Sequence, residues 1–195
     1  MSTEIEVRPA TVFEDVRALV GPQRADASVC WCLSYRIPSK VNNAMRGQER
    51  GAFVAKLLAD GPLGVLAYRD DVPVGWAAVA PRADTTFARN RKIPHVDDLP
   101  VWSVWCIRVR PGHRGQGISH ALIQGAVDYA RDHGAPALEA YPLDNGEARV
   151  DQTMAYAGLR ANFEAAGFRW AADTTSVLNG HPRVLLRHDL AQDLD

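Results

Sequence analysis

Hydrophobic and polar positions along the chain follow two periods. Short runs of β-branched and aromatic residues, alternating with polar residues or continuous, predict strands at residues 5–9, 63–68, 72–80, 101–110, 136–143, 170–177 and 183–189. Apolar residues spaced three and four apart predict helices at residues 13–20, 44–60, 118–134 and 159–166. The run at 101–110 is the richest in strand-forming residues, and we expect it to be a central strand.

The order of these elements predicts an α/β fold in which helices cover both faces of a mixed sheet. Residues 22–43 and 81–100 contain proline and many polar residues without a sustained period, so both are expected to be long loops. Loops of this length in a compact domain are often functional. The chain of 195 residues has the size of one domain, and we assign residues 1–195 to it.

Charge and composition argue against two classes of partner. Lys and Arg number 22 against 23 Asp and Glu, so the formal net charge is -1 and no basic excess favours nucleic acid. No run of apolar residues is long enough to predict a membrane span, and residues 1–6 lack the pattern of a secretory signal. Hydrophobic residues make up 47% of the chain, which is typical of folded soluble domains. We therefore expect a cytoplasmic protein.

The three cysteines are expected to be reduced. Cys30, Cys32 and Cys106 are a sparse set in a chain without an export signal, which favours thiols over a disulfide framework. No second Cys or His pair accompanies Cys30 and Cys32 at the spacing of a zinc site, so no metal is predicted. Cys106 could carry an acetyl group as a nucleophile. Because no His lies beside it on the strand, a buried structural thiol is the favoured interpretation.

The turn after the predicted central strand carries the candidate chemistry. Residues 114–119 are Arg-Gly-Gln-Gly-Ile-Ser, and the predicted helix begins at Ile118. A Gly-rich turn between a strand and a helix presents unpaired N–H groups at the positive end of the helix dipole, where phosphate binds. The spacing fits neither the dinucleotide motif GxGxxG nor a Walker A loop. Alternatively, Gly115 and Gly117 only allow a tight connection.

With this turn, the sequence resembles the GCN5-related N-acetyltransferase (GNAT) family. The family's acetyl-CoA signature, (R/Q)xxGx(G/A), corresponds to Arg114, Gly117 and Ser119, with Ser in place of Gly or Ala. Residues 162–168 are similar to the family's LYExxGF segment near the end of a helix. Ser119 keeps a small side chain at the turn but adds a hydroxyl beside the expected pyrophosphate.

The resemblance covers nearly the whole chain, from Glu4 to Leu190. It implies an α/β fold with a GNAT-type mixed, mostly antiparallel central sheet, flanked by helices on both faces. Residues 30–32 and 102–106 also resemble a branch of the family without an assigned substrate.

The resemblance implies acetyl-CoA as the co-substrate and assigns its contacts. The main chain of residues 107–109 would pair with the pantetheine arm like an added strand, and an N–H near Ile107 would polarise the thioester carbonyl. The amides of residues 115–120 would hold the pyrophosphate. The implied cofactor-binding residues are Ile107, Arg108, Val109, Arg114, Gly115, Gln116, Gly117, Ile118, Ser119 and His120.

The catalytic residues depart from the family pattern. Phe163 stands where many members carry the Tyr that protonates the CoA thiolate, and Tyr156 stands where an Asn usually contacts the pantetheine. A thiol of pKa about 8.5 leaves without a strong acid, so direct attack of a neutral amine stays feasible, with Tyr156, Tyr141 or water as proton donor. Glu139, on the same strand face as Tyr141, is either the base for the amine or an outward-facing sheet residue.

We therefore expect transfer of an acetyl group from acetyl-CoA to an amine of a small molecule or a protein, by direct attack in a ternary complex. The alternative is a catalytically silent acyl-CoA-binding module. The two long loops would form the acceptor pocket. Trp31 and Tyr35 either line it or fix the first loop to the core, and Asp97 and Asp98 either line its entrance or are solvated charges. A homodimer is compatible with the sequence.

Overall fold

Seven strands form one sheet in the computed structural model, which describes residues 4–24, 27–151 and 155–190. Their bounds are β1 Glu6–Pro9, β2 Gly64–Arg69, β3 Val72–Pro81, β4 Trp102–Val109, β5 Ala137–Ala140, β6 Arg169–Leu178 and β7 His181–Asp189. The order across the sheet is β1-β2-β3-β4-β5-β7-β6. Strands β4 and β5 are parallel, whereas the other neighbours are antiparallel. The strand predicted at 101–110 is therefore central, as expected.

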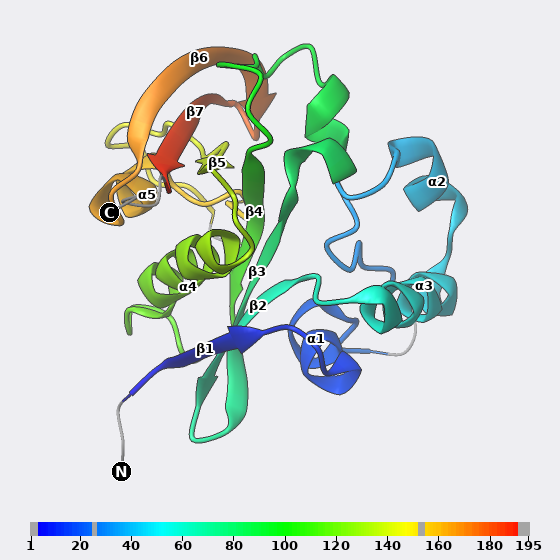
Figure 1. Cartoon of the computed structure of the whole chain (residues 1–195). Coiled ribbons are helices and arrows are strands. Elements are labelled where there is room, and N and C mark those ends of the chain that lie inside the picture. Colours follow the sequence, from blue (N-terminus) through cyan, green and yellow to red (C-terminus); the bar gives the residue numbers. More distant parts are fainter. Residues whose placement is uncertain (1–3, 25–26, 152–154, 191–195) are drawn as a thin grey trace.

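Helices cover both faces of this sheet. Their bounds are α1 Phe13–Val20, α2 Ser39–Ala44, α3 Gly47–Asp60, α4 Ile118–Asp132 and α5 Arg160–Ala165. Figure 1 shows α1, α2 and α3 on one side of the sheet and α4 and α5 on the other. This arrangement confirms the predicted fold class. Within the described ranges, none of the helices has the length and apolar character of a membrane span.

Each face of the sheet has its own hydrophobic core. On one face, the apolar stripe of α4, with Ile118, Leu122 and Ala126, is buried against the sheet. On the other face, Trp76 and Trp105 are buried with residues of α1 and α3. Central strands covered on both faces lack the alternation of a half-exposed strand, which explains the continuous apolar runs of the sequence.

The long loops are more regular than predicted. Helix α2 lies within the first loop, and α3 begins later than predicted because the Glu49 carboxylate accepts a hydrogen bond from the N–H of Arg46 (2.8 Å). The second loop contains two short 3-10 helices, η1 (Arg82–Asp84) and η2 (Thr86–Arg89). Strand β5 is shorter than predicted and ends before Pro142, which has no N–H for a sheet ladder.

Strands β4 and β5 separate after a short parallel pairing. Strand β4 pairs with β3 from residue 102 to residue 109. On its other edge, only residues 102–104 pair with β5, at residues 138–140. A β-bulge at Cys106, whose φ is 47°, interrupts the register of β4 with β3. The edge of β4 beyond the bulge therefore faces an opening instead of β5.

The expectation of three reduced cysteines was wrong for two of them. Cys32 and Cys106 form a disulfide, and Cys30 is the free thiol. The bonded residues are 74 positions apart, and they meet because the loop before α2 folds onto β4, which sequence spacing does not reveal. The bond ties this loop to the bulge beside the opening. It also engages the sulfur that a nucleophilic Cys106 would need.

Candidate functional site

A cavity of about 960 Å³ lies along the free edge of β4. Three segments form its walls: the end of α1 with the loop after it, the stretch from β4 into α4, and residues 155–165. The volume is at the upper end of ligand pockets, which span about 300–1,000 Å³, so the cavity accommodates a long ligand. Among the described residues, no group of three or more His, Cys, Asp or Glu could hold a metal ion.

The turn before α4 presents free main-chain N–H groups to this cavity. Gly115 (φ 71°) and Gly117 (φ 79°) have left-handed backbone conformations. The space that a Cβ would occupy on either residue is open, with no atom within 4 Å. In the part of the chain that the structure describes, no group accepts a hydrogen bond from the main-chain N–H groups of residues 115–120. These donors lie at the positive end of the α4 dipole, so the turn can hold a phosphate group.

The free edge of β4 offers further hydrogen-bonding groups at Val109. The N–H of Arg110 donates to the carbonyl of Val74 on β3 (2.8 Å), so alternation along the strand turns the N–H and C=O of Val109 toward the cavity. Ile107 faces the same way, but its N–H donates to the carbonyl of Tyr156 (2.7 Å). An N–H near Ile107 was expected to polarise the thioester carbonyl. This expectation needs correction for Ile107 itself, because its N–H is already bound to a neighbouring segment.

Most of the predicted cofactor-binding residues line the cavity. They are Ile107, Arg108, Val109, Arg114, Gly115, Gly117, Ile118, Ser119 and His120. The side chain of Gln116 instead contacts Arg69 and donates to the carbonyl of Gly112 (3.1 Å). Arg110 lines the same wall, and with Arg108 and Arg114 it adds positive charge that favours an anionic ligand.

Tyr156 is the predicted proton donor that the structure brings to the cavity. The residue lines the cavity wall. Burial raises the pKa of its hydroxyl, so it stays protonated at neutral pH. Phe163, at the position of the usual family acid, is fully buried against Phe168, with ring centroids 5.2 Å apart.

Glu139 and Tyr141 lie in a buried polar network outside the cavity wall. A guanidinium nitrogen of Arg82 donates to a Glu139 carboxylate oxygen (2.7 Å), and the Tyr141 hydroxyl donates to the same oxygen (3.1 Å). The side chains of Arg82 and Glu139 are only 5% and 1% exposed. Burial raises the pKa of Glu139 against the opposing attraction of Arg82. The two catalytic roles stay predictions, and the arrangement is typical of a structural ion pair.

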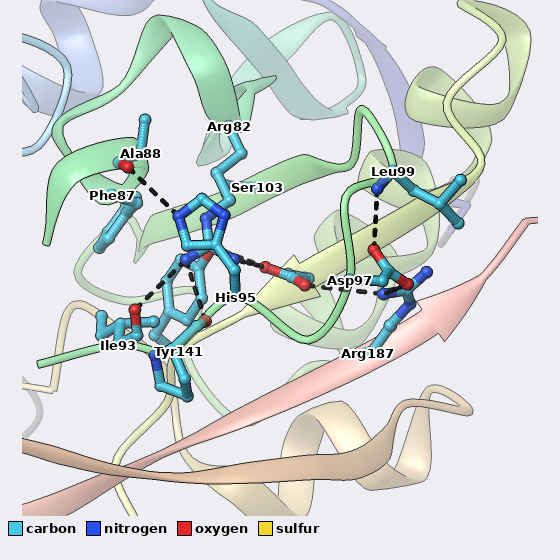
Figure 2. Close-up of polar contacts among 12 residues, drawn as sticks. Arg82, Phe87, Ala88, Ile93, His95, Asp97, Leu99, Ser103, Tyr141 and Arg187 are labelled. Carbon is cyan, nitrogen blue, oxygen red and sulfur yellow. Dashed lines mark hydrogen bonds and ion pairs between the residues drawn. The ribbon is translucent and has the colours of Figure 1, made fainter. Parts of the chain in front are cut away.

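The same network anchors the second long loop. Figure 2 shows Arg82 beside Tyr141 and, further along the loop, Asp97 facing Arg187. Arg187 on β7 donates to the Asp97 carboxylate (2.7 Å), and Arg82 donates to the carbonyl of Pro94 (3.0 Å). Asp97 is therefore ion-paired and helps to anchor the loop, instead of being only a solvated charge.

Trp31 and Tyr35 pack into the core instead of lining the cavity. The Trp31 ring is buried and stacks on Phe13, and the Tyr35 ring stacks on Phe87 with centroids 4.5 Å apart. The Tyr35 hydroxyl accepts a hydrogen bond from Arg183 on β7 (3.0 Å). Sequence reasoning did not single out Arg183, because nothing in its local pattern distinguishes it from the other charged residues of that strand.

Comparisons with known proteins agree with this geometry. Residues 34–151 match the model of a family described as Acetyltransferase (GNAT) family. No protein among the curated sequences matches the chain. Similar solved structures include an N-acetyltransferase from Staphylococcus aureus Mu50 (18% identity, TM-score 0.55, covering 96% of this chain and 99% of that one). Another is yncA from Salmonella typhimurium, solved with its cofactor acetyl-CoA (15% identity, TM-score 0.56, 98% and 96% covered).

Proposed function

The chain belongs to the GNAT acetyltransferase family, and from this premise we propose that its cavity binds acetyl-CoA and that the protein transfers the acetyl group to an amine of a small molecule or a protein. The observation that carries the proposal is the row of N–H groups at residues 115–120, which have no acceptor among the described residues and which, apart from Gln116, belong to residues that line the cavity. A diphosphate offers only acceptors, so these donors and the α4 dipole fit it. The open space at Gly115 and Gly117 lets phosphate oxygens approach the main chain.

The edge of β4 supports a place for the pantetheine arm. The N–H and C=O of Val109 can pair with an amide of the arm in the manner of an added strand. The thioester would then lie toward Ile107 and Tyr156, where β4 has separated from β5. The charged side chains Arg108, Arg110 and Arg114 would meet the phosphate end.

The proposed reaction is direct attack in a ternary complex. The neutral amine nitrogen attacks the thioester carbonyl carbon, a C–N bond forms and the C–S bond breaks. The sulfur gains a proton and the nitrogen loses one, so the products are an amide and the free CoA thiol. We assign the proton donated to sulfur to the Tyr156 hydroxyl, which lines the cavity and stays protonated at neutral pH.

Calorimetry and thiol release test this function separately. Titration with acetyl-CoA is expected to give heat and to raise the melting temperature, because the ligand binds the folded state. Thiol release is then followed with a panel of amines: amino acids, polyamines, aminoglycosides and peptides with a free N-terminus. Release with at least one amine, together with an acetylated product by mass spectrometry, supports the enzyme. Absence of any heat with acetyl-CoA contradicts the proposal at its first step.

A catalytically silent acyl-CoA-binding module is the second candidate. The observation that favours it is Phe163, which has no hydroxyl and is fully buried at the position of the usual family acid. Such a module would bind acetyl-CoA but release no thiol with any amine. A Tyr156→Phe variant helps to separate the two candidates, since it lowers thiol release only if the protein is an enzyme.

Location and assembly stay predictions. A cytoplasmic location was expected from sequence, but a disulfide such as Cys32–Cys106 is rare in reducing compartments. Cell fractionation with thiol labelling tests the location, and light scattering tests the homodimer.

A further inference from the structure

The N–H of Ile107, on the free edge of β4, already has an acceptor at the place proposed for the thioester. Its hydrogen bond to the carbonyl of Tyr156 is 2.7 Å long. A thioester carbonyl that pairs with the edge of β4 at this point needs the same donor, and a main-chain N–H has one proton to give. Acetyl-CoA must therefore compete with an acceptor that belongs to the protein itself.

The competing carbonyl belongs to the central peptide of a tight turn. The N–H of Gly158 donates to the carbonyl of Ala155 (2.9 Å), so residues 155–158 form a β-turn whose central peptide joins Tyr156 to Ala157. Ala157 does not have a positive φ, which fits a type I turn. Reversal of the central peptide converts type I into type II by changing the ψ of Tyr156 and the φ of Ala157, and it leaves both ends of the turn in place.

Both sides of this hydrogen bond are otherwise held in position. On the strand side, Cys106, the residue before the donor, is bonded to Cys32. On the turn side, the carbonyl of Gly158 accepts from the N–H of Leu143 (3.0 Å). Within the described ranges, no main-chain carbonyl accepts a hydrogen bond from the N–H of Ala157. Reversal of one peptide therefore releases the strand donor while these contacts persist, whereas a shift of the whole turn would break the bond to Leu143.

We propose that the Tyr156–Ala157 peptide is a switch whose carbonyl occupies the N–H of Ile107 in the free protein and turns away when acetyl-CoA binds. The inference rests on the proposed function, because it presumes a thioester carbonyl at the edge of β4. In a trans peptide the C=O and N–H point in opposite directions, so the reversal turns the N–H of Ala157 toward the position that the carbonyl has left. The thioester oxygen then accepts from both Ile107 and Ala157.

Two donors at this position serve the transfer itself. As the amine nitrogen bonds to the carbonyl carbon, the π electron pair of the carbonyl moves to the oxygen, and it returns when the C–S bond breaks. N–H groups directed at this developing charge stabilise the transition state more than the ground state. The switch also responds to the state of the ligand. CoA has a thiol and no thioester carbonyl, so it leaves the carbonyl of Tyr156 on Ile107.

Ala157→Gly tests the switch, because a type II turn needs a positive φ at this residue, which glycine adopts without the strain of an alanine. We expect the Kd of acetyl-CoA to fall by about fivefold in calorimetry and the Kd of CoA to stay within about twofold. The matched control is Ala155→Gly, the same substitution in the same turn at a residue whose φ the reversal does not change. It is expected to keep the wild-type ratio of the two Kd values.

Crystal structures of the wild-type protein with CoA and with acetyl-CoA give a second measurement, which does not depend on the folding of a variant. With CoA, the carbonyl of Tyr156 is expected to accept from the N–H of Ile107, as in the free protein. With acetyl-CoA, we expect the reversed peptide, with the thioester oxygen within hydrogen-bond distance of the nitrogens of Ile107 and Ala157.

Failure of the proposed function and failure of the switch give different results. A wild-type protein that does not bind acetyl-CoA overturns both. If acetyl-CoA binds, the switch alone is overturned when Ala157→Gly keeps the wild-type ratio of the two Kd values, or when Ala155→Gly changes that ratio equally. An acetyl-CoA complex in which the carbonyl of Tyr156 still accepts from Ile107 also overturns the switch.

Discussion

The turn before α4 and the network around Glu139 use polar groups in opposite ways. In the turn, the N–H groups of residues 115–120 have no acceptor among the described residues, and all of these residues except Gln116 line the cavity. In the network, one Glu139 oxygen accepts from both Arg82 and Tyr141 while the side chain is only 1% exposed. A carboxylate that is buried and already faces protein donors is not accessible to a substrate. Unused hydrogen-bonding capacity, more than residue type, therefore locates the candidate site.

The largest expected effect concerns the network. Glu139→Gln keeps the shape of the side chain but leaves the buried Arg82 without a counter-ion, which costs about 3–5 kcal/mol of the free energy of unfolding. Denaturant unfolding measures the change, and Glu147→Gln is the exposed control, expected to be near neutral. If Glu139→Gln is as stable as the wild type but shifts the pH dependence of acetyl transfer, Glu139 acts as a base. The contrast between the turn and the network is then wrong.

The next effect concerns the disulfide beside the opening. Reduction, or Cys32→Ser, is expected to lower the free energy of unfolding by about 2–4 kcal/mol, since the bond closes a long loop in the unfolded chain. Cys30→Ser, which removes the free thiol two positions away, is the control and is expected to leave stability unchanged. Equal melting temperatures with and without a reducing agent would show that the loop is held by packing alone.

A smaller effect sharpens the description of the turn. Gly117→Ala strains a left-handed residue by about 1–2 kcal/mol and places a methyl group in the cavity. We expect the affinity for acetyl-CoA to fall by about tenfold, or 1.4 kcal/mol, in calorimetry. Gly112→Ala carries the same backbone strain (φ 86°) outside the cavity wall and is expected to keep the wild-type affinity. Similar losses in both variants would attribute the effect to strain instead of contact.

The smallest expected effect is in the pH profile. Because burial raises the pKa of Tyr156 above its usual value, the hydroxyl keeps its proton to higher pH than a free tyrosine. The value of kcat/KM for the amine should rise with pH as the amine becomes neutral and should not fall again below pH of about 9.5. A decline that begins at about pH 8 would mean that the proton given to sulfur comes from a group more acidic than a buried tyrosine.

Features formed by residues close together in the sequence could be predicted, whereas contacts between distant residues could not. The apolar stripe of α4 and the glycines of its turn lie within a few positions of one another, and both were predicted from spacing. Arg82 and Glu139 are 57 positions apart, and Arg183 and Tyr35 are 148 apart. Because no local period links such residues, the pairing partners of Glu139 and Tyr35 could not be inferred.

The sequence alone determined the strand, turn and helix that hold the candidate phosphate site. Consecutive residues form this site, and their backbone preferences decide its shape. Only the tertiary structure decided which donors stay free. Ile107 and Val109 lie on the same edge of β4, yet the N–H of Ile107 binds Tyr156 while the N–H of Val109 faces the cavity. That choice depends on how a distant segment packs against the strand, because burial and long-range pairing engage polar groups irrespective of their position in the sequence.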